Sequence, residues 1–254
     1  MSQSEVEYYL NEAAANKAKW ISFTGGEPFL VPDLLENSIA YATSLNLYTE
    51  VVTNAFWANN IKKAVSTLRS LKARGLDVLN LSVDDFHQEF IPIENIRNAF
   101  ISSKRTGVKT VFLVTLKKNS KITSEYLKKY FSDMKLQKIG APKIGKTDAL
   151  VLESPFIPIN NEETIGDKPL QIEKSQSQCR EVLTHIGIKP DGTVLPCCGA
   201  LSSLEETALG NLKDKSLNSI LDKAWLNPKY TNIREKIFGT KSIDRCNECL
   251  IMFM

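Results

Sequence analysis

The sequence predicts an α/β fold in which parallel strands alternate with helices, followed by a small cysteine-rich part of mixed helix and strand. Expected strands begin near residues 20, 48, 78 and 109, and this spacing of about 30 residues matches one strand–helix unit. The strands are apolar runs rather than strictly alternating ones, as expected where both faces of a parallel sheet are covered. A barrel or partial barrel fits this pattern better than a sandwich.

Composition excludes several classes of protein. The chain has 254 residues, of which 43% are hydrophobic and 24% charged, and its net charge is +3; these are ordinary globular values. No apolar run is long enough to span a bilayer, and Met1 to Glu7 are too polar for a secretory signal peptide. The net charge does not indicate nucleic-acid binding. We expect a cytoplasmic protein that partners neither a membrane nor a nucleic acid.

Helix and strand signals divide the chain into three parts. Residues 154–178 lack periodicity and are rich in Pro, Asn, Glu, Lys and Ser, which is typical of a connecting segment. We therefore predict domains at 1–153 and 179–254, joined by that segment. Gly75 and Gly107 are expected to end two helices. The expected helices are 6–18, 32–45, 59–74, 94–105, 124–134, 217–225 and 228–238; the expected strands are 20–24, 48–53, 78–83 and 109–116, with a hairpin of 184–188 and 193–195.

Candidate binding residues stand at the carboxyl ends of the expected strands, where such folds place their chemistry. After the first strand, Gly25 and Gly26 let the backbone approach a ligand closely, and Glu27 offers a carboxylate to a cation. Asn54 follows the second strand and has both donors and acceptors.

The third expected strand ends in Ser82-Val83-Asp84. Ser82 and Asp84 lie two residues apart and so point to one face of a strand. The alternative for Asp84 or Asp85 is a helix N-cap. His87 is more often a hydrogen-bonding or packing residue in such a loop than an acid or base, and no catalytic residue is assigned.

The five cysteines all lie late in the chain, at Cys179, Cys197, Cys198, Cys246 and Cys249. An odd number without a signal peptide argues against a disulfide framework. Their clustering indicates a metal or iron–sulfur site.

Together these motifs resemble the radical S-adenosylmethionine (radical SAM) superfamily. The resemblance rests on Gly25-Gly26-Glu27-Pro28, Thr53-Asn54 and Ser82-Val83-Asp84. Cys179, followed after twelve residues by Gly192 and after four more by Cys197, is similar to the start of the SPASM auxiliary-cluster motif. Cys246 and Cys249 supply the Cys-x2-Cys pair of that motif.

The resemblance implies roles for these residues. Gly25, Gly26 and Glu27 would bind the amino group of S-adenosylmethionine, and Asn54, Ser82 and Asp84 would contact its ribose or the methionine carboxylate side. It also implies one auxiliary [4Fe–4S] cluster held by thiolates, the usual ligands of such clusters. Its ligands would be Cys179, Cys197, Cys246 and Cys249, with Cys198 as an alternative to Cys197. Zinc in the same four thiolates is the structural alternative.

Two departures from the family pattern bear on activity. No cysteine follows Cys249, so at most one auxiliary cluster is expected, as in the shorter twitch arrangement. The defining Cys-x3-Cys-x2-Cys of the superfamily is absent. The resemblance places that loop, and a first barrel strand, before the helix at 6–18. We therefore expect a (β/α)6 barrel of the TIM type without its first strand, and an internal start at Met1; a degenerate homologue is the alternative.

Two functions follow from the resemblance. The first is a radical SAM oxidoreductase that modifies a peptide or protein, with flavodoxin or ferredoxin as electron donor. It would cleave S-adenosylmethionine reductively, and the 5′-deoxyadenosyl radical would abstract a substrate hydrogen. The chain as written, without the catalytic cluster ligands, is expected to be inactive. The second is a non-catalytic peptide-binding protein with a structural metal site.

Overall fold

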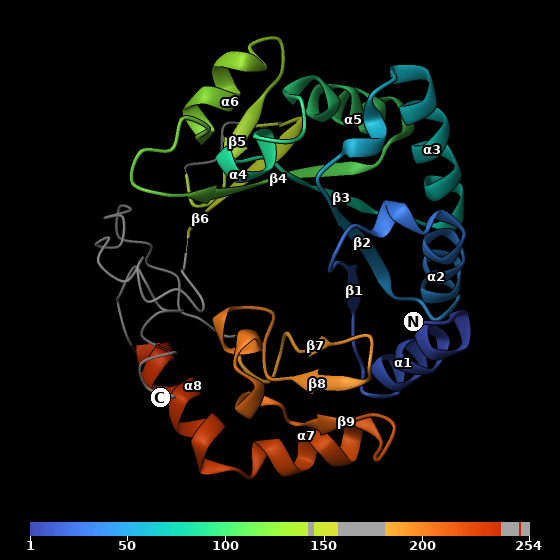
Figure 1. The fold of residues 1–254 in the computed structure, drawn as a ribbon, viewed down its shortest axis with the longest axis vertical. Helices are drawn as coiled ribbons and strands as arrows, with labels where there is room; N and C mark the ends of the chain where they lie inside the picture. The colour runs from blue at the N-terminus through green and yellow to red at the C-terminus, as the bar shows by residue number, and fades with distance from the viewer. Residues whose placement is uncertain (142–144, 157–180, 240–248, 250–254) are drawn as a thin grey trace. The chain divides into compact units, whose positions relative to one another are not determined.

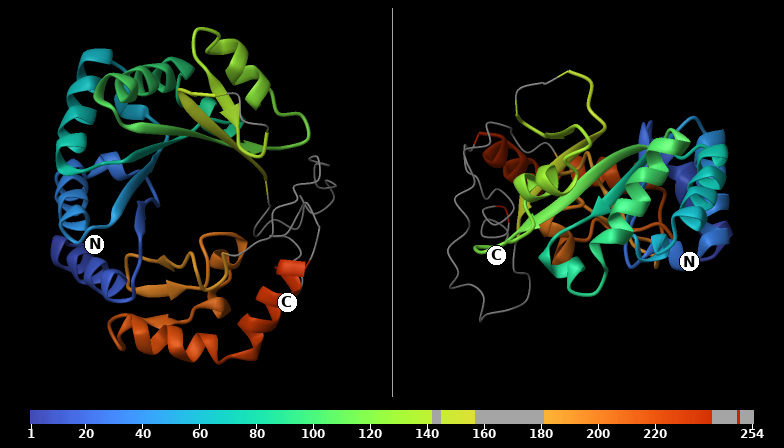
Figure 2. Two further views of the ribbon diagram at one scale, coloured as in Figure 1. Left: turned by 180° about the vertical axis from the view of Figure 1, so that it is seen from behind. Right: turned by 90° about the horizontal axis from the view of Figure 1, so that it is seen from above.

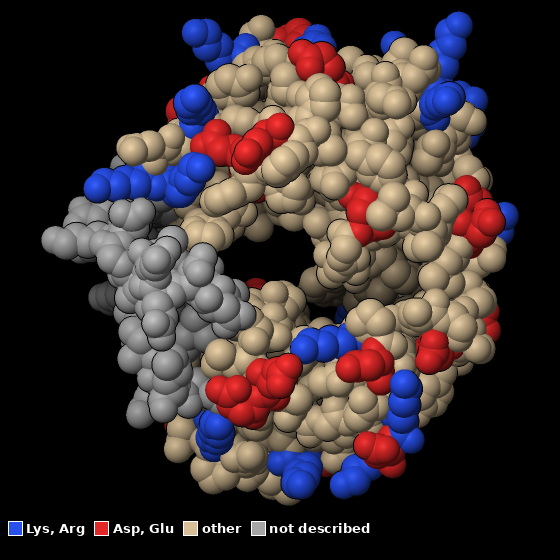
Figure 3. Space-filling view, viewed as in Figure 1, with Lys and Arg blue, Asp and Glu red and all other residues tan. Residues whose placement is uncertain are grey.

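The computed structural model describes residues 1–141, 145–156, 181–239 and 249. The chain divides into two compact units, which we call the sheet unit and the C-terminal unit. The sheet unit comprises Ser2–Leu10 and Lys17–Phe156, and the C-terminal unit comprises Met1, Asn11–Asn16 and Ile157–Met254. Among the described residues, no helix has both the length and the apolar character that a membrane span requires. On the face shown in Figure 3, acidic and basic side chains are interspersed rather than gathered by sign.

Six parallel strands form the sheet of the sheet unit, in the order β1-β2-β3-β4-β6-β5 (Figure 1). This confirms the parallel α/β class. The described strands form an open sheet with β1 and β5 at its edges, so closure into a barrel stays a prediction. The strands are β1 (Trp20–Phe23), β2 (Tyr48–Thr53), β3 (Val78–Ser82), β4 (Lys109–Leu116), β5 (Leu136–Lys138) and β6 (Ala149–Pro155).

Strands β5 and β6 depart from the simple strand–helix repeat. The four expected strands end with β4. After it, β6 pairs with β4 along Val111–Leu116, and β5, which comes earlier in the chain, pairs with the other side of β6. β5 has only three residues, too few to show a period in the sequence. The sheet therefore has one strand order that the repeat alone did not predict.

Helices cover one face of this sheet (Figures 1 and 2). Along β4, Thr110, Phe112 and Val114 are buried, whereas Val111 and Leu113 between them are half-buried. Along β3, Leu79, Asn80 and Leu81 are all buried, so coverage of both faces stays a prediction. The helices are α1 (Gln3–Ala15), α2 (Pro32–Ser44), α3 (Ile61–Arg74), α4 (Asp85–Gln88), α5 (Ile93–Thr106) and α6 (Ser124–Tyr130), with short 3-10 turns η1 (Pro28–Leu30) and η2 (Phe56–Ala58).

Three phenylalanines lie at the centre of the core between the helices and the sheet. Phe100 of α5, Phe112 of β4 and Phe131 after α6 are fully buried. Their ring centroids lie 5.0, 5.3 and 5.4 Å apart, two of the pairs edge to face, in the range that favours aromatic pairs. This cluster holds α5 and the end of α6 against β4.

The C-terminal unit contains a small antiparallel sheet in the order β7-β8-β9. The predicted hairpin is present, but its first strand is shorter than expected. Leu183 has a φ of 62°, and the N–H groups of Thr184 and His185 donate to the Glu181 carbonyl, so a turn occupies these residues. The elements are β7 (Gly187–Ile188), β8 (Thr193–Leu195), η4 (Ala200–Ser203), η5 (Glu205–Thr207), β9 (Gly210–Asn211), α7 (Leu217–Trp225) and α8 (Pro228–Gly239).

Gly75 and Gly107 end α3 and α5 in the left-handed conformation, as the sequence predicts, with φ of 113° and 76°. Their surroundings differ. A Cβ at Gly75 would collide with the Thr43 side chain, whereas a Cβ at Gly107 would meet no described atom within 4 Å.

Replacing each glycine by alanine tests this difference. Gly107→Ala should cost about 1 kcal/mol of unfolding free energy, because only the left-handed backbone disfavours a side chain there. Gly75→Ala should cost about 1–3 kcal/mol more, because the new methyl group also displaces Thr43. Urea denaturation of both variants measures the two losses, and equal losses would contradict the predicted collision.

Candidate functional site

The Glu27 carboxylate is held over the end of β2 although Glu27 itself follows β1. Its Oε1 accepts from the Thr53 hydroxyl at 2.8 Å and from the Phe29 N–H at 3.2 Å, and its Oε2 accepts from the Asn54 N–H at 2.9 Å. A carboxylate offers about four acceptor positions. Three are used by the described residues, so one position on Oε2 is left for a donor from a ligand.

Two aromatic rings support this arrangement. Phe29, next to the Glu27 loop, stacks on Trp57 with ring centroids 4.2 Å apart. The Trp57 indole N–H donates to the Thr53 hydroxyl at 3.0 Å. Because that hydroxyl in turn donates to Glu27, the stacked pair fixes the direction of the carboxylate.

Gly25 and Gly26 form an open stretch of backbone beside Glu27. Both adopt positive φ, at 85° and 56°, a conformation that glycine reaches without strain. A Cβ at either position would meet no described atom within 4 Å. A ligand can therefore approach their backbone groups directly.

Asn54 and Ser82 leave polar groups at the same edge of the sheet. The Asn54 side-chain oxygen accepts from the Phe56 N–H at 2.9 Å, which leaves its NH2 group as a donor. Ser82, the last residue of β3, is half-buried. Because β1, β2 and β3 are neighbouring parallel strands, Asn54 and Ser82 stand at the same end of the sheet as Glu27.

Asp84 serves as the N-cap of α4, the alternative that its sequence allowed. Its Oδ1 accepts from the N–H groups of Phe86 and His87 and lies 2.8 Å from the His87 Nδ1. The Asp84 side chain is only 2% exposed, whereas the His87 side chain is 40% exposed. The exposed group at the end of β3 is therefore His87, which the sequence indicated only as a hydrogen-bonding residue.

Asp84 and His87 alter each other's pKa. Burial disfavours the charged carboxylate of Asp84, but its hydrogen bonds with His87 and the positive charge of that ring outweigh burial and lower its pKa. The hydrogen bond that His87 donates to Asp84 raises the pKa of His87 against the opposing effect of burial, and the charges of Asp84 and Glu27 raise it further.

A cavity of about 560 Å³ lies at this edge, beyond β3 and β4. Its lining includes Gln88 and Glu89 near α4, Lys117 and Lys121 after β4, and Tyr126 of α6. The Asp85 carboxylate holds the loop after β4 by accepting from the Lys121 and Ile122 N–H groups. Charged side chains and amide side chains therefore line this cavity next to the strand ends.

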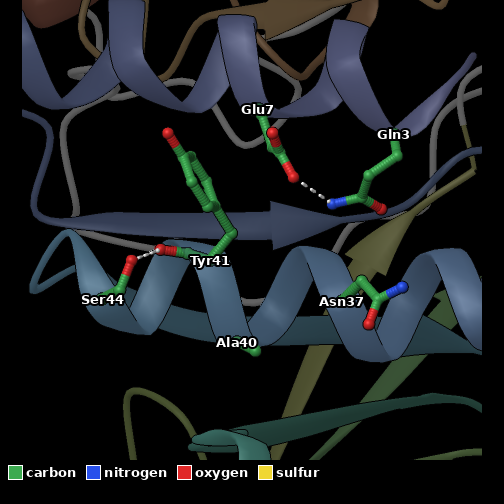
Figure 4. Close-up of a pocket in the computed structure, with 6 residues that line it drawn as sticks. All are labelled: Gln3, Glu7, Asn37, Ala40, Tyr41 and Ser44. Carbon is green, nitrogen blue, oxygen red and sulfur yellow. Dashed lines mark hydrogen bonds between the residues drawn. The ribbon is translucent and has the colours of Figure 1, made fainter.

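A second depression, of about 370 Å³, lies between α1 and α2 (Figure 4). Within it the Gln3 amide donates to Glu7 at 2.8 Å, and Asn37, Tyr41 and Ser44 line the opposite side. All of its lining residues come from these two helices, so it is separate from the strand ends.

In the C-terminal unit, two described cysteines share one apolar cluster. Cys197 and Cys249 are buried together with Val182, Tyr230 and Ile233. The Cys197 sulfur accepts from the Gly199 N–H at 3.3 Å. Cys179 and Cys246 lie outside the described residues, and the described residues alone do not assemble a group of three metal-ligating side chains.

Cys198, the neighbour of Cys197, is exposed. Its sulfur lies 3.2 Å from a Glu181 carboxylate oxygen, which also lies 3.1 Å from His185. Desolvation of the sulfur, together with the hydrogen bond to Glu181, raises the pKa of the Cys198 thiol to about 12. The two adjacent cysteines therefore have different surroundings.

The Asp84–His87 pair predicts a measurable titration. His87 should titrate above its ordinary pKa of 6.5. The pair therefore stabilises the fold below that pH while Asp84 is ionised. It loses this contribution as the pH rises through the folded-state pKa of His87, or falls through the lowered pKa of Asp84. Asp84→Asn should lower the pKa of His87, because the variant lacks the stabilising charge. NMR titration measures this directly, since the chain has only two histidines and His185 serves as the internal control. An unchanged His87 midpoint in the variant would contradict the assignment.

Comparisons with known proteins agree with these features. The sequence model of the radical SAM superfamily matches residues 1–120, and that of the SPASM iron–sulfur cluster-binding domain matches residues 179–250. YydG of Bacillus subtilis (strain 168), a protein whose name assigns it to peptide biosynthesis, is 24% identical over 204 residues. That alignment covers 78% of this chain and 60% of YydG.

Among solved structures, a domain of the pyruvate-formate lyase-activating enzyme from Bacteroides vulgatus ATCC 8482 is similar with a TM-score of 0.31 and 20% identity. The match covers 39% of this chain and 61% of that one, and a score this low adds nothing to the argument. The two family matches, at the positions of the glycine–glutamate and cysteine motifs, show that the chain belongs to the radical SAM superfamily and carries a C-terminal SPASM domain.

Proposed function

We propose that this protein binds S-adenosylmethionine at the carboxyl edge of the sheet unit and takes part in peptide modification. The observation that carries the proposal is the Glu27 carboxylate, which Thr53 and Asn54 hold in place with one acceptor position left. An ammonium group suits that position, because a charge-assisted hydrogen bond to a carboxylate is stronger than a neutral one. We propose that the carbonyl groups of Gly25 and Gly26 accept its other protons.

The remaining strand-end residues complete the proposed site. The Asn54 amide and the Ser82 hydroxyl offer polar contacts to the ribose or the methionine part of the ligand. Asp84 is committed to its N-cap and to His87, so we propose that it acts through His87 rather than by direct contact. This refines the expectation that Asp84 touches the ligand.

We propose one auxiliary iron–sulfur cluster in the C-terminal unit, with Cys179, Cys197, Cys246 and Cys249 as ligands. The shared apolar cluster of Cys197 and Cys249 supports this choice. The Gly199 N–H donates a hydrogen bond to the Cys197 sulfur, and hydrogen bonds of this kind stabilise cluster thiolates. Cys198 is directed instead to Glu181, and this geometry favours Cys197 over Cys198.

The peptide substrate and the remaining partners are inferred from the family. YydG is named for peptide biosynthesis, and this supports a peptide as the substrate. A catalytic cluster, where one is bound, would supply the electron that cleaves S-adenosylmethionine, with flavodoxin or ferredoxin as the proposed electron source. Residues 1–178 contain no cysteine, so this stretch provides no thiolate for such a cluster. Thiolate ligands also favour a reducing compartment, and we propose the cytoplasm.

The same observation favours a second candidate function. Without thiolates in residues 1–178, the chain on its own would bind S-adenosylmethionine and a peptide without cleaving either. Release of 5′-deoxyadenosine from S-adenosylmethionine under reducing, anaerobic conditions separates the two functions. Its formation supports the enzyme, and binding without it supports the non-catalytic protein.

Replacing Glu27 tests the S-adenosylmethionine site. Glu27→Gln should weaken binding about tenfold or more, because the ammonium loses a charged acceptor. Asp133→Asn removes one negative charge at the other end of the sheet, where the strands begin. The Asp133 side chain is 57% exposed, and its replacement should leave the affinity unchanged. Calorimetry measures both, with thermal unfolding as the check on folding. Equal affinities of wild type and Glu27→Gln would rule out the role given to Glu27.

The adjacent cysteines provide a matched pair for the cluster. After anaerobic reconstitution, wild type and Cys198→Ala should each hold about four irons per chain, whereas Cys197→Ala should lose most of them. Iron and sulfide analysis, with the visible absorption of the cluster, gives the measurement. Retention of iron by Cys197→Ala but not by Cys198→Ala would exchange the two roles. Zinc without iron in the wild type would overturn the cluster and leave a structural metal site.

A further inference from the structure

His87 and Glu27 lie close together although they follow different strands. Glu27 comes after β1, but its carboxylate is anchored to Thr53 and Asn54 at the end of β2. β2 pairs directly with β3, and neighbouring strands are about 4.8 Å apart. Asp84 and His87 follow the end of β3. The carboxylate of Glu27 therefore lies one strand away from His87, and the two groups interact electrostatically.

The orientation of the His87 ring follows from Asp84. Because the buried Asp84 carboxylate accepts hydrogen bonds from two backbone N–H groups, it is an acceptor toward His87 as well. The 2.8 Å contact therefore assigns a proton to Nδ1. Nε2 lies on the other side of the ring, and the side chain as a whole is 40% exposed. A protonated His87 thus has one free donor, Nε2–H.

The three connections that follow β1, β2 and β3 contain one side chain able to carry positive charge. Residues 24–31, 54–60 and 83–92 contain no lysine or arginine, and His87 is their single histidine. Within these connections, His87 is therefore the side chain able to pair with an anionic group bound at the strand ends. Lys117, the residue after β4, lies over the Phe86 ring, with its Nζ 4.7 Å from the ring centroid. Glu27, one strand away, is suited to a cationic group.

We propose that Glu27 and His87 form a clamp for an α-amino-acid group, in which Glu27 accepts from the ammonium and the His87 imidazolium donates from Nε2 to the carboxylate. The clamp rests on the proposed function, since S-adenosylmethionine is the ligand that carries such a group. Asp84 is the positioning residue of the clamp, because it holds the ring from Nδ1 without touching the ligand. The clamp makes the carboxylate of the ligand a determinant of specificity.

Two ligands that differ in one group test the clamp. Decarboxylated S-adenosylmethionine keeps the amine and the nucleoside but lacks the carboxylate. Wild type should bind S-adenosylmethionine about tenfold more tightly than the decarboxylated ligand, the worth of one charge-assisted contact. His87→Gln should bind the two ligands with nearly equal affinity, while its affinity for the decarboxylated ligand stays that of the wild type.

His185→Gln is the matched control, because it removes the second histidine from the other unit, and it should keep the tenfold preference. Calorimetry at one pH gives all six affinities, and thermal unfolding checks that each variant folds. A full preference in His87→Gln, or an equal loss for both ligands, would overturn the clamp while S-adenosylmethionine binding by the wild type still stands. Failure of the wild type to bind either ligand would instead overturn the proposed function, and the clamp with it.

Discussion

The hydrogen bonds between the Glu27 carboxylate and the end of β2 are the constraint on which the strand-end site depends. They join the loop after β1 to Thr53 and Asn54, and the stacked pair of Phe29 and Trp57 supports them. A half-buried carboxylate would be costly without such partners. Its partners come from the backbone and one hydroxyl rather than from a lysine or arginine, so the negative charge is oriented without being neutralised and stays available to a cationic ligand group.

A parallel sheet explains why short motifs far apart in the chain act together. The carboxyl ends of β1, β2 and β3 are neighbours, so Gly25, Asn54 and Ser82 lie at one edge although about 30 residues separate each from the next. The Asp84–His87 pair, which follows β3, lies at the same end of the sheet. There a buried acid caps α4 and also holds the His87 ring through Nδ1, so one carboxylate serves both the helix cap and the proposed clamp.

Much of the sheet unit could be predicted because its strands and helices are long enough to show a period. The bounds of β2 and β4 agree with the sequence prediction, and the glycine stops of α3 and α5 are confirmed. The three-residue β5 and the four-residue α4 are too short to show one.

The sequence alone determined the family motifs, the absence of cysteine before residue 179 and the candidate set of ligands, because these depend on residue type and spacing. It left open which of two adjacent cysteines is a ligand and whether Asp84 is a cap or a contact. The tertiary structure separates buried Cys197, beside Cys249, from Cys198 beside Glu181, and it commits Asp84 to His87. Burial and hydrogen bonds distinguish the two cysteines and assign Asp84 to the cap, and they depend on residues brought close only when the chain folds.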